Sequence, residues 1–548
     1  MPGTFHWVDW GVLLLYVFGT SWLADRLAGK GQTVRDFFLG GRKLPWYAVS
    51  GSIVASEVSG VTFVSVPLTA FTGDYTYMML AIGSVLARFV IAGWLVPAYY
   101  RHEIYSPYEF MGRRLGPEVD RLATVIFFVG SFLAQGARLY LAAMVLNAIT
   151  HMGIVWAVLL IGAISVVWTW LGGINSVVWT DVVQFVVLFV GGVVALGAVI
   201  AVVPGGLPEI LRQGLEDGKF RIVDLTLDRT TAYTLWCGIL GSTFLTMSSH
   251  GTDQNMAQRL FCCKDERDAR KAILWSSVSQ VLPLLMLTVG VGIYVYFKRN
   301  PMSAGESELF RENKNNLFPI FILKAMPVGV KGLLFAAIFS AATATGTLAA
   351  MAQTALTTFY KPFFGKGASE AHLIRVSRFL VLVAAAGLCG TALLVSSIKD
   401  YPNLLDLALA MAGYTYGAML GILLLALLPL GRDARGLYWG VPFSMLLIFA
   451  LNWQQESWGR WIVALGTEAL SAWAAIALRR EPFKLGWVLL AAGAVLAVAL
   501  MWLPNGEPFK LAFPWHYPIG AAVTLGLGIA LGRKRLATAG EASVSSPP

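Results

Sequence analysis

The amino-acid sequence predicts an all-α polytopic membrane protein, and three observations support this fold class. Of the 548 residues, 57% are hydrophobic and only 13% are charged. Many uncharged runs reach the roughly 20 apolar residues that a helix needs to cross a bilayer. Lysine and arginine are also divided unevenly between alternate loops, as they are in membrane proteins. An ordinary soluble domain does not combine these three properties.

The apolar runs predict about 15 transmembrane helices. Their expected bounds are 7–24, 45–72, 76–100, 121–149, 153–171, 176–203, 232–258, 272–297, 332–360, 379–396, 402–430, 436–453, 459–478, 485–503 and 514–532. The first run lacks a basic start and a small-residue cleavage site. We therefore expect it to be retained in the protein rather than removed as a signal peptide.

The loop charges predict the orientation of the chain. One set of alternate loops holds 26 Lys and Arg residues, the other set holds 13, and Arg88 and Arg138 fall inside the predicted spans. Cytoplasmic loops carry the excess of basic residues. The sequence therefore predicts a multi-pass protein of the cell inner (plasma) membrane, with its N-terminus outside and its C-terminus cytoplasmic. The net charge of +10 then implies the lipid bilayer as partner and no nucleic acid.

Two predicted spans are interrupted by small and polar residues near their middle. The span 45–72 contains Ser56-Glu57-Val58-Ser59-Gly60, and the span 232–258 contains Gly241-Ser242-Thr243 and the stretch from Thr246 to Gly251. Unwound backbone costs several kcal/mol for each unsatisfied group in lipid, so it must line a cavity or pack against protein. These interruptions predict a binding site between the two spans.

The interrupted spans open two sets of five helices, 45–203 and 232–430. Because five is an odd number, the second set starts on the opposite side of the membrane from the first. Paired interruptions in two inverted halves are typical of secondary transporters. The outer loops 204–231 and 298–331 are long enough for short surface helices. The other expected units are an N-terminal extra helix and cytoplasmic loop (1–44), additional C-terminal transmembrane helices (436–532) and a disordered cytoplasmic tail (533–548).

Three motifs make the chain resemble the sodium/solute symporter family, which includes transporters of proline, pantothenate, sugars, sialic acid and iodide. The motifs are "RDFFLGGRKLPWYAVSGS" (35–52), "LGGINSVVWTDVVQF" (171–185) and "GTDQNMAQRL" (251–260). The resemblance covers roughly residues 5 to 430. It implies a LeuT-type five-plus-five inverted repeat with one N-terminal and about four C-terminal extra helices.

The resemblance also implies Na⁺ as the coupling ion. Its ligands would be backbone carbonyls of Ala55 and Val58, together with hydroxyls of the eighth core helix, because sodium favours oxygen ligands. The family pattern there is Ala-x-x-Ser followed by Ser or Thr. Three alignments of 335–361 place Ser340 beside Ala341, Thr343 beside Ala342, or Thr345 beside Ala344. None supplies both hydroxyls, so either one hydroxyl is missing from the site or the ion or stoichiometry differs.

Asp181 and Glu57 are two acidic residues inside predicted spans that are candidates for a functional role. The resemblance places Asp181 at a second cation site or a gating position; the alternative is an acid that caps or pairs near the cytoplasmic end of its helix. Glu57 must face a partner or water, because a charge in the bilayer is costly. It is either a coupling residue or half of a fixed ion pair with Arg88. An unpaired Glu57 would stay protonated, which keeps proton coupling as an alternative.

Arg138 lies in the third core helix, which the resemblance places at the substrate cavity. A guanidinium can bind a carboxylate with two hydrogen bonds, which favours an anionic substrate, although a pair with Glu57 is an alternative. The other candidate substrate-binding residues are Thr62, Thr246, Ser249, His250, Tyr414 and Tyr416. The tyrosines could instead pack within the membrane, and His250 could only satisfy the interrupted backbone.

Catalysis is not expected. The six histidines and four cysteines are dispersed, and no H-E-x-x-H or G-x-S-x-G motif is present, so neither an enzyme nor a transition-metal site is predicted. We expect a sodium-coupled symporter that imports a small polar organic solute, such as a sugar, a sugar acid or another carboxylate, by alternating access. The transport unit is expected to be a monomer. A non-transporting membrane sensor of such a solute is the rival class.

Overall fold

The computed structural model describes residues 5–27, 38–58, 60–102, 104, 106–150, 152–340, 345–397, 404–453 and 511–532. Within these ranges the chain forms helices, joined by short segments that include one isolated bridge between Leu44 and Cys263. Seven described helices are long and apolar enough to cross a membrane, and one bent pair makes an eighth. The predicted class, a multi-pass helical membrane protein, is confirmed.

The described residues of the first half of the chain form nine α-helices. They are α1 (Trp7–Leu27), α3 (Trp46–Glu57), α4 (Gly60–Thr72), α5 (Met79–Val90), α6 (Val96–Arg101), α7 (Pro107–Leu115), α8 (Pro117–Thr150), α9 (Ile154–Val202) and α10 (Gly206–Glu216). The π-helical segment η3 (Ile91–Leu95) joins α5 to α6, and the 3₁₀ segments η1 (Gly40–Arg42) and η2 (Thr76–Met78) precede α3 and α5.

The second half begins with the π-helical segment η4 (Cys237–Ser242). The helices that follow are α11 (Thr243–Gly251), α12 (Gln254–Phe261), α13 (Glu266–Trp275), α14 (Val281–Arg299), α15 (Ala304–Glu312), α16 (Leu317–Ala325), α17 (Val330–Ser340), α18 (Thr345–Thr354), α19 (Lys361–Phe363), α20 (Glu370–Val395), α21 (Leu404–Leu427), α22 (Leu437–Trp453) and α25 (His516–Leu531). Shorter 3₁₀ or π segments are η5 (Ser276–Gln280), η6 (Lys314–Asn316), η7 (Ala355–Tyr360) and η8 (Phe513–Trp515).

The first interrupted span is broken where the sequence predicted. Helix α3 ends at Glu57, Val58 takes an extended conformation (φ −80°, ψ 101°), and α4 begins at Gly60. The two halves of the span meet at an angle of 55°. Since Val58 no longer continues the helix, polar backbone groups next to Glu57 are available to line a cavity.

The second interruption lies further along the chain than the sequence predicted. The residues from Thr243 to Gly251 are helical, and the helix breaks at Thr252 and Asp253, before α12 begins. The hydroxyls of Ser248 and Thr252 donate to carbonyls one turn earlier in the same helix, at 2.7 Å each. These hydroxyls are therefore satisfied within the helix, and the backbone stays helical around them.

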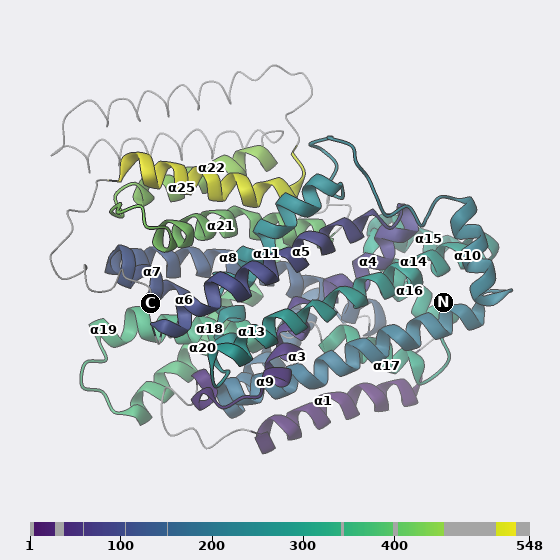
Figure 1. The fold of residues 1–548 in the computed structure, drawn as a ribbon. Coiled ribbons are helices and arrows are strands. Elements are labelled where there is room, and N and C mark those ends of the chain that lie inside the picture. Colours follow the sequence, from purple (N-terminus) through teal and green to yellow (C-terminus); the bar gives the residue numbers. More distant parts are fainter. Residues whose placement is uncertain are drawn as a thin grey trace.

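The long helices lie side by side in one bundle (Figure 1). Helix α1 runs along one edge, against α9 and α17, while α21, α22 and α25 pack together near the opposite edge. The expected spans 153–171 and 176–203 correspond to the two helical parts of α9, which are separated by a kink at Gly173 (φ 57°, ψ −152°). The short helices α10, α15 and α16 lie in the connections 204–231 and 298–331, where short helices were expected.

Three expectations stay predictions. They are the total of 15 spans, the inverted relation between 45–203 and 232–430, and the orientation of the termini. Of the expected units, spans 459–478 and 485–503 and the tail 533–548 lie outside the described residues.

Candidate functional site

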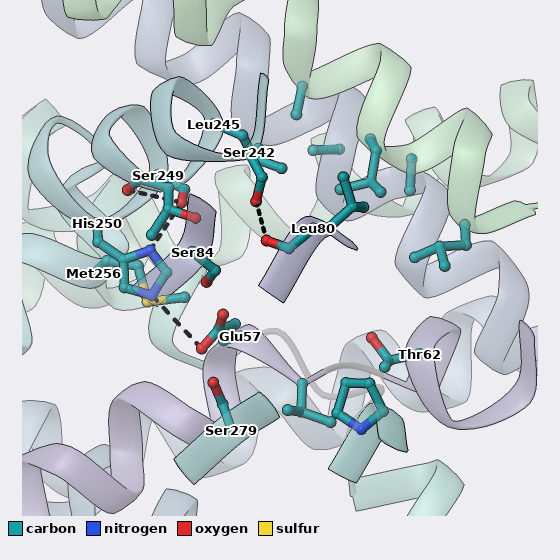
Figure 2. A pocket seen from close by; sticks show the side chains of 18 of the residues that line it. Glu57, Thr62, Leu80, Ser84, Ser242, Leu245, Ser249, His250, Met256 and Ser279 are labelled. Atoms are coloured by element: carbon teal, nitrogen blue, oxygen red, sulfur yellow. Dashed lines mark hydrogen bonds and ion pairs between the residues drawn. The ribbon is translucent and has the colours of Figure 1, made fainter. Parts of the chain in front are cut away.

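A cavity opens where α3 gives way to α4 (Figure 2). Its walls also come from α5, α8, α11, α14 and α21, so segments from both halves of the chain meet there. The polar lining residues are Glu57, Thr62, Tyr77, Ser84, Gln135, Arg138, Ser242, Thr246, Ser249, His250, Asp253, Asn255, Ser279, Gln280 and Tyr416. Apolar side chains such as Leu80, Leu245 and Leu409 complete the wall.

Glu57 forms an ion pair with Arg88. The Arg88 side chain is fully buried and also donates to Ser276 Oγ at 3.0 Å and to the Ser84 carbonyl at 3.0 Å. Gln280 Nε2 donates to the other carboxylate oxygen of Glu57 at 3.2 Å. The predicted fixed pair between Glu57 and Arg88 is therefore present. An unpaired Glu57, the premise of the proton-coupled alternative, is not what the structure contains.

Arg138 projects from α8 to the same cavity and donates to the carbonyl of Ser56 at 3.3 Å. That carbonyl lies in the last turn of α3, next to the break. The alternative pairing of Arg138 with Glu57 is not formed, because Arg88 occupies that position. Among the described residues, no carboxylate lies within 4.0 Å of the Arg138 guanidinium.

Asp253 and Tyr416 form a hydrogen bond that the sequence did not predict. Asp253 caps the N-terminus of α12 by accepting from the Asn255 amide at 2.8 Å. Its other oxygen accepts a hydrogen bond from the Tyr416 hydroxyl. Both residues line the cavity, and Asp253 stands in the motif "GTDQNMAQRL". An acid that directly follows a predicted broken helix was the available signal for this residue.

His250 lines the cavity opposite Glu57, and its side chain is buried (Figure 2). Its Nδ1 atom lies 2.9 Å from Ser249 Oγ, and its Nε2 atom lies 3.8 Å from Glu57 Oε2. Thr62 and Thr246 are also buried at the cavity wall. His250, Thr62 and Thr246 therefore line the cavity, and their binding of substrate stays a prediction.

Of the two tyrosines predicted to face the substrate, only Tyr416 lines the cavity. The ring of Tyr414 packs against Phe449 of α22, with ring centroids 5.8 Å apart. Residues two apart on a helix point in different directions, so a single helix face cannot present both side chains. Tyr414 therefore does not line this cavity, and a substrate-binding role for it stays a prediction.

The candidate sodium ligands in the described part of the chain lie at the end of α3 and on α17 and α18. Ala55 and Val58 are buried at the end of α3, and Val58 also lines the cavity. Ser340 ends α17 and Thr345 begins α18; both are buried. The segment between them, with Thr343, lies outside the described residues. Which hydroxyls bind sodium therefore stays a prediction.

Asp181 lies apart from this cavity and is paired. Its carboxylate accepts from Arg259 Nη2 at 2.8 Å and from Ser52 Oγ at 2.5 Å. The side chains of Asp181 and Arg259 are only 3% and 1% exposed. This cluster ties α3, α9 and α12 together. Of the predicted roles for Asp181, the pairing role is the one that the geometry forms; a cation-binding role stays a prediction.

The chain is similar to a family of known transport proteins. The model of the sodium:solute symporter family matches residues 37–442. A sodium/sialic acid symporter of Proteus mirabilis is 23% identical over 457 residues, which cover 82% of this chain and 91% of that protein. The human sodium/iodide cotransporter is 28% identical over 452 residues, covering 81% of this chain and 69% of that protein. The bovine sodium-coupled monocarboxylate transporter 2 is 29% identical over 429 residues, covering 77% and 68%.

A solved structure supports the fold. The outward-open, substrate-bound structure of a Na⁺-coupled sialic acid symporter superposes with a TM-score of 0.75 at 20% sequence identity. The superposition covers 96% of this chain and 99% of that one. The helical arrangement seen here is therefore that of a known transporter fold.

Proposed function

The chain belongs to the sodium:solute symporter family, with sodium as its coupling ion, and we propose that it imports a small carboxylate through the cavity at the α3–α4 break. It is a transporter and not an enzyme. The carrying observation is Arg138, a cation at the cavity wall for which the described part of the chain provides no carboxylate within 4.0 Å.

The charges of the cavity favour a carboxylate at Arg138. The charge of Glu57 is balanced by Arg88, and Asp253 is held by the Tyr416 hydroxyl and an α12 amide. Of the two arginines near the cavity, Arg88 is fully buried behind Glu57, whereas Arg138 lines the space. The Arg138 guanidinium has five N–H donors, and its hydrogen bond to the Ser56 carbonyl uses one of them. Two further donors can engage a carboxylate side by side.

Arg138 also connects the cavity to the predicted sodium site. It bonds the carbonyl of Ser56, which lies between the proposed sodium ligand Ala55 and Glu57. A sodium ion at the end of α3 would fix the same helical turn that supplies this carbonyl. Sodium and substrate would then favour the same state, which is the thermodynamic requirement for coupling.

We expect transport by alternating access, directed inward. An inside-negative membrane potential contributes about 2.3 kcal/mol per charge per 100 mV to sodium entry. The proposed orientation has the N-terminus outside and the C-terminus in the cytoplasm, and the proposed transport unit is a monomer. The ligand set at Ala55, Val58 and the hydroxyls of the eighth core helix remains part of this proposal.

The direct test is ligand-dependent thermal stabilisation of the purified protein in sodium or potassium chloride. The panel contains monocarboxylates, sugar acids, neutral sugars and amino acids. We expect carboxylates to stabilise the protein in sodium only, and Arg138→Gln to weaken their binding about 10- to 100-fold. Arg311→Gln, which removes the same charge from the exposed helix α15, is the matched control. Stabilisation by neutral sugars alone would contradict the proposal.

A further inference from the structure

His250 presents a buried polar atom with no hydrogen-bond acceptor in the described part of the chain. The residue is only 3% exposed, and its Nε2 atom forms no hydrogen bond there. Native proteins leave few buried polar atoms unpaired, and such atoms usually bind a water, an ion or a ligand. Because His250 lines the cavity, its Nε2 atom is a candidate ligand contact.

The neighbours of His250 indicate which nitrogen carries a proton. Ser249 Oγ lies 2.9 Å from Nδ1 and 3.3 Å from the Thr246 carbonyl, and a hydroxyl has one hydrogen to donate. On the other side, Nε2 faces the carboxylate of Glu57 at 3.8 Å. A protonated Nε2 is attracted by that carboxylate, whereas a lone pair on Nε2 would be repelled. The environment therefore favours Ser249 donating to Nδ1 and leaves Nε2–H as a donor.

Glu57 retains capacity to accept a further hydrogen bond. Its two oxygens receive Arg88 and Gln280, while an ionised carboxylate offers about four lone-pair sites. The Glu57 side chain is 21% exposed, although its partner Arg88 is completely buried. Glu57 is therefore an acceptor at the cavity wall, directly beside the donor on His250 (Figure 2).

A donor and an acceptor 3.8 Å apart do not form a direct hydrogen bond, but one hydroxyl group can bond to both. Its oxygen accepts from Nε2–H, and its hydrogen is donated to the carboxylate. A methyl group or a simple alkyl chain can do neither. We infer that Glu57 and His250 bind one hydroxyl of the substrate, so that the transported solute is a hydroxylated carboxylate. This inference rests on the proposed function, because Arg138 supplies the carboxylate contact.

The consequence is a selectivity that an arginine alone does not provide. An unsubstituted monocarboxylate would satisfy Arg138 and leave the polar groups of Glu57 and His250 without a ligand. A neutral sugar would satisfy Glu57 and His250 but leave Arg138 unused. A site that is built to bond a hydroxyl discriminates strongly against an analogue without it.

The experiment compares ligands that differ by one hydroxyl or more on the same carbon chain. Affinities of 2-, 3- and 4-hydroxybutyrate are measured against butyrate, and of gluconate against hexanoate, by thermal stabilisation of the full-length protein in sodium chloride. We expect at least one hydroxylated ligand to bind about tenfold or more tightly than its parent, since it gains a hydrogen bond to a charged group.

Two substitutions at His250 test the assignment. His250→Leu removes the donor at similar volume and is expected to bring the affinity ratio of each hydroxylated ligand to its parent close to one. His250→Gln keeps an N–H donor and should retain part of the preference. His372→Ala, a histidine whose Nε2 bonds Tyr360 away from the cavity, is the matched control. If His250→Leu does not yield a monodisperse protein, His250→Ala replaces it.

Equal affinity for both members of every pair in the unmodified protein would overturn the inference. So would a hydroxyl preference that persists unchanged in His250→Leu or His250→Ala. In both of these cases carboxylates still bind, and the proposed function stands. If no carboxylate binds at all, the proposed function fails and the hydroxyl assignment fails with it.

Discussion

Two buried pairs of an acid and an arginine, Glu57–Arg88 and Asp181–Arg259, occupy different kinds of surroundings in the same bundle. Both arginines are almost completely buried, at 0% and 1% exposure. The acids differ, because Glu57 is 21% exposed at the cavity and Asp181 only 3%. The comparison teaches that pairing alone does not define a functional carboxylate. What matters is whether the pair leaves an oxygen accessible to a ligand.

The enclosed pair should show the largest effect on stability. Arg259→Ala leaves Asp181 as an uncompensated buried charge, and we expect the free energy of unfolding to fall by about 3–5 kcal/mol. Thermal unfolding in detergent measures this loss. The double variant Asp181→Asn/Arg259→Ala removes the charge and should recover part of it. A loss below about 1 kcal/mol in the single variant would mean that the Asp181–Arg259 pair contributes little to the stability of the fold.

The cavity pair should be less costly to break. In Arg88→Ala the Glu57 carboxylate keeps its bond to Gln280 and can be hydrated from the cavity. We expect a loss of about 1–3 kcal/mol, together with weaker binding of substrate in sodium. The same unfolding assay applies, paired with ligand stabilisation. If Arg88→Ala proved as damaging to stability as Arg259→Ala, the distinction between the two pairs would be lost.

A third buried acid sharpens the comparison, because amides rather than an arginine hold it. Asp9 of α1 is fully buried and accepts from the amides of Gly329 at 2.7 Å and Gly332 at 3.0 Å, at the start of α17. Asp9→Ala should cost about 1–2 kcal/mol, as loss of a helix cap does, whereas Asp9→Asn should cost less. Equal losses in the two variants, measured by thermal unfolding, would argue against the capping role.

The smallest effect is expected in the connection 298–331, where Glu306 pairs with Lys324 at 2.8 Å. Burial raises the pKa of the Glu306 carboxyl, but hydrogen bonds from Lys324 and from the backbone of Ser303 outweigh it, so the pKa lies below its usual value. A lowered pKa contributes stability above the ordinary pKa of about 4.3, and this contribution disappears as the pH falls through the lowered value.

We therefore expect Glu306→Gln to destabilise the protein at pH 7 by up to about 1 kcal/mol and to have no effect once the carboxyl is protonated at low pH. Thermal unfolding of both proteins between pH 7 and pH 3 provides the measurement. A difference that grows as the pH falls would reverse the expected sign and refute this account of the pair.

Sequence reasoning located the first helix break but misplaced the second. Both segments are rich in small and polar residues, and composition does not reveal where a hydroxyl finds its partner. In α11, Ser248 bonds the Phe244 carbonyl at 2.7 Å, so the helix continues to Gly251. Around Glu57 the carboxylate is drawn to Arg88 instead, and α3 ends there. Composition alone therefore did not distinguish the segment that unwinds from the one that stays helical.

The sequence predicted which residues line the cavity better than it predicted which of them pair with one another. Glu57 and Arg138 were predicted at the cavity, and both line it. The choice between Arg88 and Arg138 as partner of Glu57 depends on how α5 and α8 pack, which hydropathy does not specify. For the same reason, Gln280 and Asp253 were not selected: a lone amide or acid near a helix end is usually exposed, and only the packing of distant helices brought these two to the cavity.

Uptake into proteoliposomes tests the central claim most directly. Vesicles that contain the protein receive an inward sodium gradient, and accumulation of a labelled hydroxylated carboxylate, taken from the stabilisation panel, is followed against a potassium control. The account predicts accumulation driven by sodium only, preserved in Arg311→Gln and reduced at least tenfold in Arg138→Gln at subsaturating substrate. Accumulation that is equal in potassium, or unaffected by Arg138→Gln, would contradict it.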